Sequence, residues 1–102
     1  MRILIMCISG MSSSLFVVNV YEAAKKMGLT DVVCEAINSK LAPSSRLNYD
    51  CVFLAPQIRY QKPAIQRKVG KDVPIEVLDF TTYGFFDGEK VLKRALELLK
   101  KD

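Results

Sequence analysis

The chain has 102 residues, of which half are hydrophobic and a quarter are charged, with a net charge of +4. This length and balance predict one globular domain over residues 1–102 and exclude a disordered chain. There is no histidine, which excludes serine–histidine and cysteine–histidine catalysis and any histidine metal site within the chain. We therefore expect neither a metal nor a cofactor.

Three cysteines, Cys7, Cys34 and Cys51, are spaced too widely for a CxxC redox or zinc motif. An odd number of cysteines does not favour a disulfide scaffold, so a reducing compartment such as the cytosol is expected. No run of eighteen apolar residues occurs, and we expect no transmembrane helix. The apolar start resembles a short signal peptide, but we interpret it as a buried strand.

The first half of the chain is predicted to alternate strand and helix. Residues 2–7 form an apolar run that suits a strand buried on both faces. Residues 9–14 predict a loop, and a helix follows that ends at Gly28. A second strand is predicted over residues 31–37, and the polar stretch 38–48 allows one short helix near residues 44–47. The apolar positions of the first helix recur at helical spacing: Phe16, Val20, Ala23, Ala24 and Met27.

The second half continues the alternation. A third strand over residues 51–55 stops at Pro56, and a helix over residues 59–69 ends at Gly70. Proline is tolerated only near a helix start or a strand edge, which places Pro63 early in this helix. The fourth strand covers residues 73–78, with Pro74 near its beginning or on an edge. Residues 81–84 form a turn, and Asp87 caps a final helix over residues 89–101. The apolar face of that helix comprises Val91, Leu92, Ala95, Leu98 and Leu99.

Four strand–helix units predict an α/β fold with a four-stranded parallel sheet and helices on both faces. We expect the flavodoxin-like strand order 2-1-3-4, which resembles the low-molecular-weight tyrosine phosphatases. In such sheets a ligand binds beyond the carboxyl ends of the strands, where the strand order reverses beside the first strand. This position belongs to Cys7 and the residues after it.

The segment after Cys7 is rich in serine and contains a glycine. Backbone N–H groups of such a loop, together with the start of the next helix, form a cradle for an anion. The same field favours a thiolate, so we expect a lowered pKa for Cys7, which then acts as a phosphoryl acceptor. Cys34 and Cys51 lie inside apolar strands and are expected to be small core residues. The candidate phosphate-binding residues are Ile8, Ser9, Gly10, Met11, Ser12, Ser13 and Ser14.

Two other interpretations remain open at this point. A small cysteine phosphatase or arsenate reductase has an arginine where this loop has Ser13, and without it the transition-state charge loses its bidentate partner. The loop therefore suits holding a phosphocysteine and passing it on. The second alternative is a noncatalytic module that binds nucleic acid or a regulator through the basic stretch 59–71. We interpret that stretch as a solvated helix face and expect no nucleic-acid partner.

Three segments in order resemble one family. Residues 7–15, 55–60 and 83–92 resemble the active loop, the Pro-Gln-Val-Arg-Tyr segment and the Tyr-Gly-x-x-Asp-Gly-x-x-Val-Leu segment of certain enzyme IIB proteins. These are the IIB proteins of the lactose/cellobiose (chitobiose) branch of the bacterial sugar phosphotransferase system. The chain departs from the family at Pro63 and in the less acidic stretch 38–48.

The resemblance implies a phosphocarrier. Cys7 would accept a phosphoryl group from a phosphohistidine of a IIA protein or domain, and would pass it to a sugar. That sugar, of the cellobiose, lactose or chitobiose type, would be bound by the membrane-embedded IIC transporter. The resemblance further implies a cytoplasmic protein that associates peripherally with the membrane through IIC. With no large exposed apolar patch evident, we expect a monomer.

Residues after the third and fourth strands should lie at the same sheet edge as Cys7. We consider Gln57, Arg59, Tyr60 and Tyr83 as candidate partner-docking residues. Tyr60 or Tyr83 is also placed to shield the thiol. For Asp79 and Tyr83, loop closure and packing is the favoured interpretation.

Overall fold

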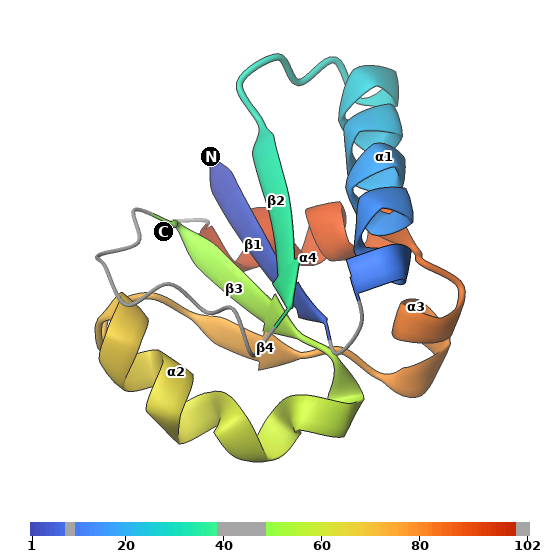
Figure 1. Cartoon of the computed structure of the whole chain (residues 1–102). Coiled ribbons are helices and arrows are strands. Elements are labelled where there is room, and N and C mark those ends of the chain that lie inside the picture. The colour runs from blue at the N-terminus through green and yellow to red at the C-terminus, as the bar shows by residue number, and fades with distance from the viewer. Residues whose placement is uncertain (8–9, 39–48, 100–102) are drawn as a thin grey trace.

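The computed structural model describes residues 1–7, 10–38 and 49–99, with the backbone alone for residues 10–14 and 38. Four parallel strands form one sheet in the order β2-β1-β3-β4 (Figure 1). This confirms the predicted fold class and strand order. The strands are β1 (Arg2–Cys7), β2 (Val33–Asn38), β3 (Cys51–Leu54) and β4 (Ile75–Val77).

Helices cover both faces of the sheet (Figure 1). One layer contains α1 (Gly10–Lys26), α3 (Phe80–Gly84) and α4 (Gly88–Leu99), and the other contains the 3₁₀ helix η2 (Pro56–Gln61) and α2 (Lys62–Val69). None of the described helices is long and apolar enough to cross a bilayer.

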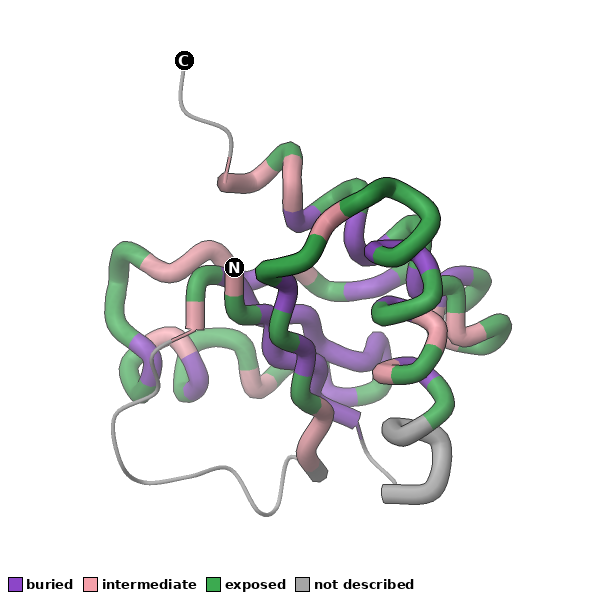
Figure 2. Tube along the Cα trace, turned by 90° about the horizontal axis from the view of Figure 1, so that it is seen from above, coloured by how far each residue is buried: buried purple, intermediate pink, exposed green. Residues whose placement is uncertain are grey.

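The central strand β1 explains the two layers. Successive side chains of a strand point to opposite faces, so Ile3, Ile5 and Cys7 pack toward α1 and α4. Leu4 and Met6 pack toward η2 and α2. Both sets are at most 1% exposed, which accounts for the uninterrupted apolar run in the sequence. Figure 2 shows this burial concentrated in the strands at the centre of the molecule.

Helix ends follow the predicted signals in several places. Gly28 and Gly70 have positive φ angles of 74° and 105°, a conformation that glycine adopts without steric cost. Pro63 stands in the first turn of α2, as its missing N–H requires. The Asp87 carboxylate accepts a hydrogen bond of 3.0 Å from the Lys90 backbone N–H at the start of α4.

Four expectations about the elements are wrong. Residues 10–14 are helical, residues 80–84 form the helix α3 rather than a turn, and η2 precedes α2. In addition, Met27 is 42% exposed and lies outside the buried face of α1. Sequence reasoning failed on the first two because glycine, serine and threonine favour loops inside a chain but are tolerated in the first turn of a helix. The short helix predicted near residues 44–47 lies outside the described residues.

Candidate functional site

Cys7 lies at the carboxyl end of the central strand, at the point where the strand order reverses. β2 pairs with β1 on one side and β3 pairs on the other, and the Cys7 backbone stands opposite Asn38. This is the edge at which open α/β sheets bind their ligands. The structure therefore places Cys7 where the sequence predicted it.

The helix α1 begins three residues after Cys7, at Gly10. Of the candidate phosphate-binding residues, Gly10 to Ser14 occupy the first five positions of α1, and Ile8 and Ser9 lie outside the described residues. The expected seven-residue loop is thus largely a helix start. A helix start presents unpaired N–H groups and a partial positive charge, and the first turn of α1 contains no acidic residue. The arrangement favours an anion near Cys7.

The expected lowering of the Cys7 pKa is wrong in direction. Cys7 is 0% exposed, and burial raises the pKa of its thiol above the ordinary value, while a side-chain hydrogen bond with Tyr83 lowers the pKa in part. Burial outweighs the hydrogen bond with Tyr83 because removing a thiolate from water is costly. Burial therefore disfavours the thiolate, and the thiol must lose its proton when it becomes a nucleophile.

Tyr83 in α3 is the residue that reaches the thiol. Besides its hydrogen bond with Cys7, it is half-buried and packs against the core clusters on both sides of the sheet. Its ring centroid lies 6.0 Å from that of Phe16 in α1. Of the two tyrosines considered as shields, Tyr83 contacts the thiol. Its half-buried position agrees with the packing role favoured for Tyr83 from the sequence. Its hydrogen bond with the sulfur adds a second role, because that bond lowers the pKa of Cys7.

Two capping contacts hold α3 in place. The Asp79 carboxylate accepts a hydrogen bond of 2.9 Å from the Thr82 backbone N–H, which caps α3 at its start. After α3, the Asn19 side-chain amide donates a hydrogen bond of 2.7 Å to the Phe86 carbonyl. Phe86 has a positive φ of 52°, so the turn between α3 and α4 is strained and relies on such a contact. These bonds fix the position of Tyr83 relative to α1.

Gly88 brings α4 close to α1. A Cβ atom added at Gly88 would lie 2.4 Å from the Asn19 carbonyl carbon and from the Val20 nitrogen. Only glycine permits this approach of two backbones. Sequence reasoning assigned no role to Asn19 or Gly88, and the Asp-Gly pair at residues 87–88 was the available signal for the close approach.

The candidate docking residues Gln57, Arg59 and Tyr60 lie in η2, directly after the carboxyl end of β3. All three are exposed. The Arg59 guanidinium donates a hydrogen bond of 3.0 Å to the Pro56 carbonyl. Tyr60 is 73% exposed and its hydroxyl accepts a hydrogen bond from Gln61, so it does not cover the thiol. These residues share the sheet edge of Cys7 without forming its immediate surroundings.

Cys34 and Cys51 are core residues, as predicted. They are 3% and 0% exposed, and burial raises the pKa of each to about 12. All three cysteines are free thiols. Across the described parts of the chain, no three histidine, cysteine or carboxylate side chains come together as metal ligands. Cys7 thus differs from the other two thiols by its place at the carboxyl edge and its bond with Tyr83.

Comparison with known proteins identifies a matching family model and several relatives. Residues 2–94 match the family model described as the lactose/cellobiose-specific IIB subunit of the phosphotransferase system. The chain is 32% identical over 99 residues to the oligo-beta-mannoside-specific EIIB component of Bacillus subtilis, covering 96% of this chain and 95% of that protein. It is 31% identical over 98 residues to each of two Lactococcus lactis proteins, the galactose-specific and cellobiose-specific EIIB components, with 91% of each chain covered.

Solved structures agree with these relationships. The cellobiose-specific IIB component of Borrelia burgdorferi has a TM-score of 0.69 at 32% identity, covering 95% of this chain and 89% of that one. The lactose-specific IIB domain of Streptococcus pneumoniae has a TM-score of 0.76 at 18% identity, with 98% of both chains covered, and so shares the fold. This chain therefore belongs to the lactose/cellobiose-specific IIB subunits of the phosphotransferase system, sugar phosphotransferase components that work through a phosphocysteine intermediate.

Proposed function

We propose that Cys7 is the residue that carries the phosphoryl group, within a single IIB unit spanning residues 1–102. In this proposal Cys7 accepts the group from a phosphohistidine of a IIA protein and passes it to a sugar bound by the IIC membrane transporter. The observation that carries the proposal is the position of Cys7 at the switch point of the sheet, three residues before the acid-free start of a 17-residue helix.

The first transfer exchanges one bond to phosphorus for another. The phosphorus–nitrogen bond of the donor phosphohistidine breaks and a phosphorus–sulfur bond to Cys7 forms. The thiol proton leaves as the sulfur attacks, and the freed histidine nitrogen takes it up. This chain has no histidine, so the phosphohistidine must come from a partner. In the proposal, backbone N–H groups of residues 8–14 hold the phosphoryl oxygens.

Tyr83 has a defined task in this step. Its hydroxyl is a hydrogen-bond donor to the sulfur, and such a bond favours the thiolate over the thiol. It thereby offsets part of the burial that raises the pKa of Cys7. Burial has its own use, because exclusion of water protects the phosphocysteine from hydrolysis. The combination suits a residue that must hold a phosphoryl group and release it only to a partner.

In the second transfer, a sugar hydroxyl oxygen bonds to phosphorus, the phosphorus–sulfur bond breaks, and the hydroxyl proton returns to the Cys7 sulfur. We propose a sugar of the cellobiose, lactose or chitobiose type. The cellobiose-specific relative supports this class, and the other two relatives are specific for an oligo-beta-mannoside and for galactose. The transporter places the reaction at the cytoplasmic membrane surface. Gln57, Arg59, Tyr60 and Tyr83 are the proposed docking residues for the two partners.

The experiment that tests the proposal is mass spectrometry of the chain after incubation with phosphoenolpyruvate, the general phosphotransferase proteins and a panel of IIA proteins. We expect one added phosphoryl group, located on the peptide that contains Cys7 and absent when IIA is omitted. Membranes carrying cellobiose, lactose, mannoside or galactose transporters would then identify the sugar by discharge of the label. A chain left unmodified by the whole panel, or labelled at another residue, would refute the assignment of Cys7.

A further inference from the structure

The positive charge of the protein is concentrated in one stretch. Residues 51–71 contain five basic residues and no acidic one, whereas the rest of the chain has ten basic and eleven acidic residues. The remainder of the molecule is thus slightly acidic, and the net charge of +4 arises from this stretch. We call these five exposed residues the basic surface: Arg59, Lys62, Arg67, Lys68 and Lys71.

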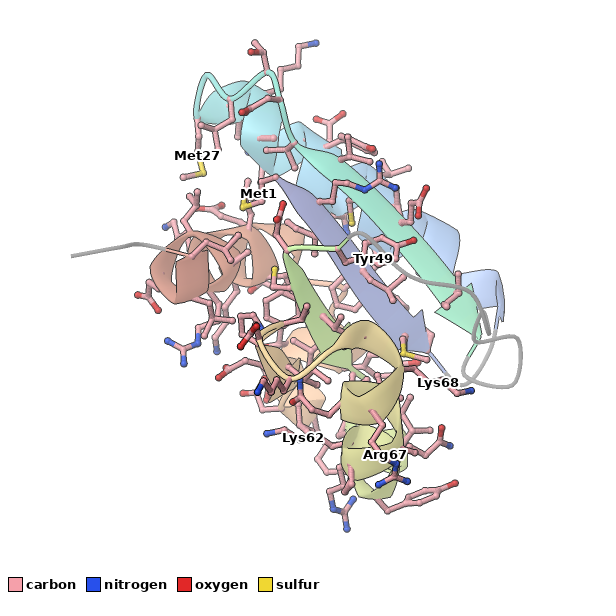
Figure 3. All side chains as sticks on the ribbon, turned by 90° about the vertical axis from the view of Figure 1, so that its left-hand side faces the viewer. Met1, Met27, Tyr49, Lys62, Arg67 and Lys68 are labelled. Carbon is pink, nitrogen blue, oxygen red and sulfur yellow. The ribbon has the colours of Figure 1, made fainter. Side chains whose placement is uncertain are left out.

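The fold turns the basic surface outward. Ile65 and Val69 bury one side of α2 against the sheet. Arg67 and Lys68 stand on the exposed part of the helix, and Lys71 follows in the turn after Gly70. Figure 3 looks onto this layer and shows Lys62, Arg67 and Lys68 spread around α2 with their amino and guanidinium groups extending from the ribbon. The solvent-facing part of this layer therefore carries all five positive charges of the basic surface.

The cations of the basic surface differ from those of α4 in their ion pairing. Within the described residues, each of the four ion pairs involves α4: Lys90–Asp79, Lys93–Glu89, Arg94–Glu76 and Arg94–Glu97. No member of the basic surface forms an ion pair with another described residue. Unpaired cations on one side of a protein attract an external anionic surface.

We propose that the basic surface rests on anionic phospholipid headgroups of the membrane. The choice of partner rests on the proposed function, which requires the chain to work beside a membrane transporter. Lysines and arginines near an anionic membrane each add to binding, and the basic surface presents five of them, three in α2, one in η2 and one in the turn after α2. Single-stranded nucleic acid is less suited, because Tyr60 is the one aromatic residue between Arg59 and Lys71, and successive bases would need several such residues to stack on.

The test is binding of the full chain to lipid vesicles at low ionic strength. We expect the chain to sediment with vesicles of phosphatidylglycerol and phosphatidylcholine in equal parts, and not with vesicles of phosphatidylcholine alone. Each lysine or arginine near an anionic membrane contributes about fivefold in affinity. The triple variant Arg67→Gln, Lys68→Gln, Lys71→Gln should therefore bind roughly a hundredfold more weakly. Rising salt should release the wild-type chain.

A matched variant separates the basic surface from net charge. Lys25→Gln, Lys26→Gln, Lys93→Gln removes the same charge from α1 and α4, and it should weaken binding by less than about fivefold. Equal weakening by both triple variants would overturn the proposal, as would failure of the wild-type chain to bind anionic vesicles. The same holds if a single-stranded oligonucleotide binds more tightly than the vesicles at equal ionic strength.

The phosphorylation assay distinguishes this proposal from the proposed function. The basic-surface variant should accept a phosphoryl group from IIA in solution at the wild-type rate, because none of its substituted residues lies at Cys7. Its sugar-dependent discharge by transporter-containing membranes should be slower than in wild type. Vesicle binding without phosphorylation of Cys7 would refute the proposed function alone. Phosphorylation without vesicle binding would refute the lipid proposal alone.

Discussion

The two helical layers of this protein differ in how their polar groups are satisfied. In the layer of α1, α3 and α4, aromatic rings pack on one another, the caps of α3 and α4 are made by aspartates, and the cations of α4 form ion pairs. In the layer of η2 and α2, the cations stay unpaired within the described residues, and neither helix has a side-chain cap at its start.

This difference indicates that the layer of α1, α3 and α4 holds the candidate site, whereas the layer of η2 and α2 is available for contact with other molecules. Cys7 belongs to the core cluster on the α1 and α4 side, and Tyr83 reaches it from α3. Precise placement of a reacting atom needs neighbours locked by packing and hydrogen bonds, and this layer supplies them. The α2 layer contributes apolar residues to the core and leaves its charge outward. Matched changes in the two layers should therefore have unequal effects on Cys7.

The largest effect is expected from Cys7→Ser. The variant should fold normally and accept no phosphoryl group from phospho-IIA, because a serine hydroxyl is a much weaker nucleophile than a cysteine thiol unless a base activates it. Transfer of radioactive phosphate, followed on gels, is the measurement, with circular dichroism as the folding check. Cys51→Ser in β3 is the control and should keep its label. Equal labelling of Cys7→Ser and wild type would contradict the role of Cys7.

Gly88→Ala should be the most destabilising change between α1 and α4. The added methyl group would overlap the Asn19 and Val20 backbones, and the required backbone shift costs about 3 kcal/mol. Thermal unfolding should show a fall in Tm of about 15 °C. Gly84→Ala is the matched control, since nothing lies within 4 Å of a Cβ at Gly84. Equal Tm values for the two variants would show that α1 and α4 can move apart without loss of stability, which would contradict the prediction.

Tyr83→Phe and Tyr60→Phe compare the two layers directly. Loss of the Tyr83 hydroxyl removes a hydrogen bond that lowers the pKa of Cys7, so that pKa should rise further. A hydrogen bond to a charged group contributes about 1.5–3 kcal/mol, which predicts phosphoryl acceptance slowed by about tenfold or more. The pH profile of Cys7 alkylation should shift to higher pH. Tyr60→Phe should leave the alkylation profile of Cys7 unchanged, because Tyr60 is exposed and bonds to Gln61 rather than to the thiol. An identical shift of the profile in the two variants would show that Tyr83 has no specific effect on Cys7.

The smallest expected effect is a loss of folding stability at alkaline pH, caused by the buried thiol of Cys34. Burial raises the pKa of Cys34 to about 12 in the folded chain, whereas an unfolded cysteine ionises near its ordinary pKa of about 8.5. Stability from this thiol is complete below the ordinary pKa and is lost as the pH rises toward 12, because only the unfolded chain then loses the proton.

Urea unfolding of wild type and Cys34→Ala measures this loss. From about pH 9 upward, the stability advantage of wild type should shrink by about 1.4 kcal/mol per pH unit. Comparing the two proteins cancels the titration of lysines and tyrosines common to both. An advantage that stays constant up to about pH 11 would mean that the buried thiol ionises without resistance.

Much of the fold was predictable because it depends on local patterns. The apolar run at residues 2–7 predicted β1 with its observed bounds, and the strand–helix alternation predicted the sheet order. Boundaries were less predictable where small polar residues form the first turn of a helix, as at Gly10 and in α3. There, burial of Phe16 and Thr82 against the core outweighs a weak preference for a loop.

The candidate site was predictable in part for the same reason. Cys7 at a strand end before a glycine- and serine-rich segment is a local signal, and it located the candidate nucleophile. The sign of its pKa shift was not predictable. Complete burial of the thiol depends on α1, α3 and the strands together. It therefore cannot be inferred from any single segment of the sequence.

By itself, the sequence determined the order of the elements, the residue at the switch point and the concentration of charge in residues 51–71. Each of these follows from neighbours along the chain. Only the tertiary structure decided that Tyr83 rather than Tyr60 meets the thiol, that Asn19 and Gly88 hold the turn before α4, and that burial raises the pKa of Cys7. Those outcomes depend on contacts between residues distant in sequence, and their energies arise from packing and burial that exist only in the folded chain.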